Sequence, residues 1–157
     1  MTNLQQSLSV LLERNNYPEL TKQLLLLIIN HPDGGFDVIV RNEMLAKHNI
    51  RRITDIKNYT LDVITDYALL CMQDGVLTDE EIKSISLLKL FLGIEEGDFY
   101  RNGKKDVVKL ILTKQLQLLF ADGVIDSKEA IFMSDMQGLF GLSYVEYEEF
   151  ILEVSKK

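Results

Sequence analysis

The sequence predicts an all-α fold, an orthogonal bundle of seven or eight helices with an internal duplication of a helix, an Asp-Gly loop and a second helix. Three observations lead to this prediction. Apolar residues recur every three or four positions along almost the whole chain, which is the spacing of one helix face. Only 2 of the 157 residues are proline. An Asp-Gly-Val triplet occurs at 74–76 and again at 122–124, an offset of 48 residues.

Composition and charge narrow the class of protein. A chain of 157 residues has the usual size of one domain, so we expect a single domain over residues 1–157. Hydrophobic residues make up 46% and charged residues 26%, as in ordinary globular proteins. The net charge of −7 disfavours nucleic acid as a partner and favours a cationic protein. One cysteine, no signal peptide and no long apolar run together predict a cytoplasmic protein without membrane insertion.

The helices are expected to follow one another with short polar turns between them. Leucines at three- and four-residue steps form the stripe of the first helix, and Pro18 suits the first turn of the second, over 18–30. A His-Pro-Asp-Gly-Gly breaker follows at 31–35. Residues 36–40 are strand-like in composition, but no pairing partner is near, so we favour a helix over 37–48. Further helices are expected at residues 50–71, 79–92, shortly after 94, 104–120, 127–140 and 144–155.

The duplication is a gap-free alignment of residues 72–81 with residues 120–129. In each copy an apolar helix ends, an Asp-Gly pair turns the chain, two apolar residues pin the loop to the core, and a second helix begins. We expect Gly75 and Gly123 to close the preceding helix in left-handed backbone, where glycine has no steric penalty.

Each second helix is expected to begin with a capping box, in which a side chain at the cap and a glutamate three residues later bond each other's amides. Thr78 and Glu81 would form it in the first copy, and Asp126 and Glu129 in the second. A glycine then stops each helix, and one more box opens the last helix of the chain. These residues are Gly93, Gly141, Ser143 and Glu146.

The acidic loops are candidate sites for a divalent cation, with Ca²⁺ as the candidate ion, although no cofactor is required. Their spacing imitates the second half of an EF-hand loop, but the first half offers no oxygen ligands, which excludes a true EF-hand. The other interpretation is that these acids serve only as caps and helix-dipole partners. The candidate ligands are Asp74, Thr78 and Glu81 in the first loop and Asp122, Asp126 and Glu129 in the second.

The two loops, each followed by a capped helix, a glycine stop and a short acidic helix, resemble the TerB-like (tellurite-resistance protein B) family. The similarity covers residues 58–153, whereas residues 1–57 carry little family signal. It implies a cytoplasmic bacterial all-α fold with internal duplication and acidic loops suspected of binding divalent metal. It also implies a role in chemical-stress or phage-related complexes rather than in catalysis. Gln73 departs from the small residue that the family often has before Asp-Gly, whereas Ala121 fits.

No catalytic motif is recognisable in the sequence. It has no Gly-rich phosphate loop, His-Glu-x-x-His helix, Cys-x-x-Cys pair or Gly-x-Ser-x-Gly elbow. Cys71 falls on an apolar face and is expected in the core as a small hydrophobic residue. We therefore expect a protein that is not an enzyme, and an unrecognised carboxylate site between the helices is the least favoured alternative.

The favoured function is a non-catalytic acidic binding protein of TerB-like type, which acts through protein–protein interaction in a bacterial stress or toxic-challenge response. The alternative is an immunity protein, an inhibitor that binds and neutralises a cationic nuclease toxin, because acidic side chains accelerate association with a basic partner. The last helix is the candidate contact surface, with aromatic anchors among glutamates. Its candidate residues are Tyr144, Glu146, Tyr147, Glu148, Glu149 and Glu153.

Overall fold

The structure is a computed structural model that describes residues 1–119 and 127–155, with the side chains of 131–153 in the second stretch. The described residues contain helices and no strand, which confirms the all-α prediction. They form nine α-helices, one more than the upper number predicted, and the short helix expected after residue 94 is the single-turn α6. The α-helices are α1 (Asn3–Arg14), α2 (Glu19–Ile29), α3 (Val38–Lys47), α4 (Lys57–Cys71), α5 (Asp79–Leu92), α6 (Asp98–Arg101), α7 (Lys105–Leu119), α8 (Ser127–Leu139) and α9 (Tyr144–Ser155).

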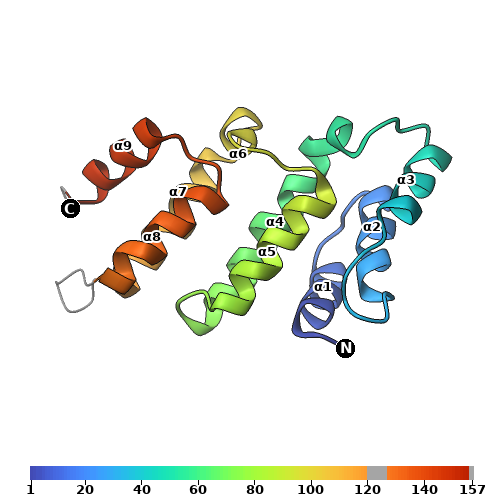
Figure 1. Ribbon diagram of the computed structural model, residues 1–157, viewed down its shortest axis with the longest axis horizontal. Helices are drawn as coiled ribbons and strands as arrows, with labels where there is room; N and C mark the ends of the chain where they lie inside the picture. Colours follow the sequence, from blue (N-terminus) through green and yellow to red (C-terminus); the bar gives the residue numbers. More distant parts are fainter. Residues whose placement is uncertain (120–126, 156–157) are drawn as a thin grey trace.

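The helices form a row along the long axis of the molecule, with α1 to α3 at one end, α4 and α5 in the middle, and α7 to α9 at the other end (Figure 1). Helix α4 packs against α1, α5 and α7, and α5 also packs against α8. One continuous core joins them, and Leu8, Ile64 and Leu112 from three of these helices are fully buried in it. Cys71 lies in this core as predicted, and burial raises the pKa of its thiol to about 12.

Two segments show how local and tertiary effects set the helix starts. The helix predicted over 50–71 begins only at Lys57, because a 3-10 turn, Ile53–Ile56, precedes it and buries both isoleucines. The second segment is residues 36–40, which are strand-like in composition. Its last three residues form the first turn of α3. There the Asp37 carboxylate accepts hydrogen bonds from the amides of Ile39 and Val40, at 2.8 and 3.3 Å. This N-cap outweighs the β propensity of the apolar residues.

The helix bounds repeat at the predicted offset of 48 residues. Helices α4 and α7 each have 15 residues and begin at Lys57 and Lys105, and α5 and α8 begin with the same offset. Gly93 and Gly141 follow these second helices with φ of +70° and +66°. In both places the next amide bonds to the carbonyl five residues earlier, which is the Schellman pattern. The duplication itself stays a prediction, since the second Asp-Gly loop lies in residues 120–126, outside the described chain.

Candidate interaction surface

The first Asp-Gly loop is held by its capping box and by a buried glutamine. The amide of Glu81 donates to the Thr78 hydroxyl at 3.1 Å, and the amide of Thr78 donates to the Glu81 carboxylate at 2.8 Å, as predicted. The amide of Leu77, a residue only 3% exposed, donates to Oε1 of Gln115 on α7 at 3.0 Å. Gln115 is fully buried, and its Nε2 donates to the Gly75 carbonyl at 3.4 Å. The loop is therefore fixed to α7, an anchor that the sequence analysis missed.

Two details of this loop differ from the prediction. Gly75 has φ +120° and ψ −137°, so it is not in the left-handed helical region, because a 3-10 turn, Met72–Asp74, continues the chain beyond α4. A glycine is still required there, since almost no other residue adopts that backbone conformation. Val76 is 38% exposed, so Leu77 alone of the two apolar residues reaches the core.

The candidate metal ligands of the first loop have other partners or lie in solvent. The Thr78 hydroxyl and the Glu81 carboxylate bond amides of the capping box, and Asp74 is exposed. Among the side chains that the structure describes, no three His, Cys, Asp or Glu groups gather as a metal site would require. The candidates of the second loop lie outside the described residues: Asp122, Asp126 and the side chain of Glu129. The cation site stays a prediction.

Helix α9 presents an exposed surface that combines aromatic, apolar and acidic side chains. Tyr144 is 71% exposed, Val145 64% and Leu152 56%, and Glu148 and Glu149 are exposed between them. Their spacing of one, three or four residues places all five on one side of the helix. We call these five residues the α9 face. Three of them were predicted as contact residues, whereas Val145 and Leu152 were not.

The other three predicted contact residues hold α9 in place. Glu146 forms the predicted capping box with Ser143, since its carboxylate accepts the Ser143 amide at 2.8 Å and its own amide donates to the Ser143 hydroxyl at 3.1 Å. Tyr147 is half-buried against the core, and burial raises the pKa of its phenol. The Glu153 carboxylate pairs with Lys109 of α7 at 2.9 Å. These contacts orient the helix so that the α9 face points outward.

A groove of about 390 Å³ lies between α6 and the start of α9. Its walls include Glu96, Tyr100, Arg101 and Glu146. Burial raises the pKa of the Tyr100 phenol, and the glutamates of α9 raise it further, Glu146 foremost. The groove is thus in the negative field of α9, next to the α9 face.

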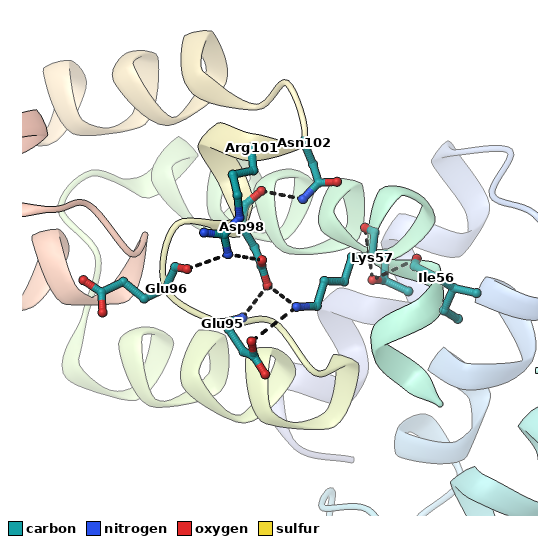
Figure 2. A network of polar contacts seen from close by, with 8 residues as sticks. Ile56, Lys57, Glu95, Glu96, Asp98, Arg101 and Asn102 are labelled. Atoms are coloured by element: carbon teal, nitrogen blue, oxygen red, sulfur yellow. Dashed lines mark hydrogen bonds and ion pairs between the residues drawn. The ribbon is translucent and has the colours of Figure 1, made fainter. Parts of the chain in front are cut away.

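An ion network adjoins this groove, because Arg101 belongs to both (Figure 2). Asp98 is 3% exposed, and its carboxylate pairs with Lys57 at 2.7 Å and with Arg101 at 2.8 Å. It also accepts the amide of Glu95 at 2.6 Å. Burial acts to raise the pKa of Asp98, but these three contacts outweigh it and hold the pKa below its ordinary value. The Glu95 carboxylate also lies 3.6 Å from Lys57, so the network holds two carboxylates and two cations. It joins the start of α4 to the α5–α6 connection, and this charge balance indicates a structural role.

Comparison of the chain with protein-family models, with curated proteins and with solved structures found no match. Along the described part of the chain, no helix combines the length and the apolar character needed to cross a membrane.

Proposed function

We propose that the protein is a non-catalytic acidic binding protein of TerB-like type, which acts through protein–protein interaction in a bacterial stress or toxic-challenge response. The observation that supports this proposal is the α9 face, where Tyr144 stands exposed beside Glu148 and Glu149. An exposed aromatic ring supplies an anchor for a partner, and the carboxylates around it steer a basic partner toward it.

The charges of α9 favour a cationic partner. Among the described residues, no lysine, arginine or histidine forms an ion pair with Glu148 or Glu149. A lysine or arginine of the partner would pair with them without displacing an internal contact. The net charge of −7 adds a long-range attraction in the same direction.

An immunity protein that neutralises a cationic nuclease toxin is the second candidate. The groove between α6 and α9 favours it, since the carboxylates at its wall suit a lysine or arginine from the phosphate-binding site of a nuclease. This candidate requires tight, salt-sensitive binding to a single basic partner.

Affinity capture from the native cell at low salt, followed by mass spectrometry, tests both candidates. The bait is the wild type, a triple variant of the α9 face (Tyr144→Ala, Glu148→Gln, Glu149→Gln) and a matched control, Glu43→Gln, at an exposed acid of α3. Several stress-response proteins that bind the wild type and the control, but not the triple variant, would support the TerB-like function. A single basic nuclease domain, captured at low salt and released as the salt concentration rises, would support the immunity protein. If the triple variant captures the same proteins as the wild type, the α9 face is not the contact surface.

We also propose that Ca²⁺ binds the acidic Asp-Gly loops, and this proposal has its own test. Ca²⁺ is expected to raise the midpoint of thermal unfolding, and Asp122→Asn combined with Glu129→Gln is expected to abolish the shift. The Glu43→Gln variant should keep it. The absence of any shift at millimolar calcium would reject the metal site and leave the partner proposal standing.

A further inference from the structure

A second groove lies between α2 and α3. These two helices stand at the end of the helix row opposite to α9 (Figure 1). Its volume is about 400 Å³, and its apolar wall consists of Leu26, Leu27, Val40 and Met44. Leu26 is 41% exposed and Val40 43%, so the wall is open to a partner.

Two more apolar residues are exposed in the first turn of α3, although they do not line the groove. Val38 is 46% exposed and Ile39 70%, and both directly precede Val40. Three consecutive apolar residues in solvent are not needed to form α3, whose start is fixed by the Asp37 cap. Together with the groove wall, these residues leave apolar surface at this end of the molecule that a partner would bury.

The shape of the groove suits an α-helix. Its lining residues on α2 run from Gln23 to Asn30, and those on α3 run from Asp37 to Met44. Eight residues of helix, with seven rises between them, extend over about 10 Å, which is also the length of an apolar stripe at positions i, i+4 and i+7 of a docked helix.

The charges around the groove define which helix fits. Among the residues that line the groove, Asp37 carries the one carboxylate. Asp33 is exposed in the adjoining turn. Both carboxylates lie at the end where α2 finishes and α3 begins. A second copy of the chain, docked groove to groove about a two-fold axis that runs along the groove, would bring these like charges together at the interface. A foreign helix with lysine or arginine at that end would instead neutralise them.

We propose that the α2–α3 groove binds an amphipathic helix of a partner protein. Its apolar side chains pack on Leu26 and Val40, and its basic residues lie at the end that meets Asp33 and Asp37. This site is separate from the α9 face and does not depend on the function proposed for it.

The test uses two synthetic 15-residue helical peptides with leucines at i, i+4, i+7 and i+11, one with three lysines at one end and the other with three glutamates there. Binding of the labelled peptides to the full chain is followed by fluorescence anisotropy. The protein variants are Leu26→Gln with Val40→Gln, and Asp33→Asn with Asp37→Asn, since asparagine keeps the cap of α3. Leu90→Gln on α5, at a residue 71% exposed, is the matched control.

The lysine peptide is expected to bind the wild type and Leu90→Gln equally, and each double variant about tenfold more weakly. The glutamate peptide should bind the wild type about tenfold more weakly than the lysine peptide. Absent binding of the lysine peptide, equal binding of both peptides, or no effect of Leu26→Gln with Val40→Gln would overturn the proposal. Self-association of the wild type in sedimentation, lost in that variant, would also overturn it, because a second copy would then cover the groove.

Discussion

Replacing Gln115 with methionine would test how the first Asp-Gly loop is held. Methionine has nearly the volume of glutamine but accepts no strong hydrogen bond, so the substitution removes the anchor without opening a cavity. The amide of Leu77 would then remain buried without its acceptor, which now lies at 3.0 Å. We expect Gln115→Met to destabilise the fold and to loosen this loop first.

The magnitude follows from burial. Leu77 is 3% and Gln115 0% exposed, so neither group can turn to solvent instead. A buried amide left unpaired costs about 1–3 kcal/mol, and the longer bond to the Gly75 carbonyl adds little. In a chain of 157 residues each kcal/mol lowers the thermal midpoint by about 2–4 °C, so we expect a fall of about 2–12 °C.

Thermal unfolding by circular dichroism measures the midpoint, and amide hydrogen exchange measures the protection of Leu77. The matched control is Gln117→Met, the same substitution at an exposed position of α7, which should stay within about 2 °C of the wild type. If Gln115→Met has the same thermal midpoint as the control, and the amide of Leu77 exchanges no faster than in the wild type, Gln115 does not hold the loop.

Substitutions at three further residues test the charge, steric and capping arguments. Asp98→Asn is expected to cost about 2–4 kcal/mol at neutral pH, because Lys57 loses its buried carboxylate. The folded state lowers the pKa of Asp98, so this difference is complete above the unfolded value of about 3.9 and shrinks as the pH falls through the folded value. Urea unfolding across pH checks it, and a pH-independent difference would contradict it. Gly93→Ala places a Cβ 2.8 Å from Cγ2 of Ile53 at φ +70°. It should lower the free energy of unfolding by about 1–3 kcal/mol, and an unchanged denaturation curve would refute the steric argument. Thr78→Ala should cost about 1 kcal/mol in the same assay and Thr78→Ser should restore it; failure of serine to do so would exclude the cap as the cause.

Local patterns in the sequence were sufficient to predict the helices and most of the positions at which they begin and end. Apolar spacing, the Thr78 and Ser143 capping boxes and the glycine stops all act within a few residues, so they can be recognised without knowing what packs nearby. The predictions failed where a distant contact intervened. The 3-10 turn before Lys57 buries Ile53 and Ile56 in the core, which local spacing does not reveal.

The candidate surface depended on tertiary packing. The sequence shows that the last helix is rich in tyrosine and glutamate. Packing against the core decides that Tyr147 is half-buried while Tyr144 is exposed. The roles of Gln115 and Asp98 were likewise hidden, since each has one partner far away in the chain: Leu77 is 38 residues from Gln115, and Lys57 is 41 residues from Asp98. A helical period of 3.6 residues tells which side chains share a face. Which of those faces is buried depends on the other helices that pack against it.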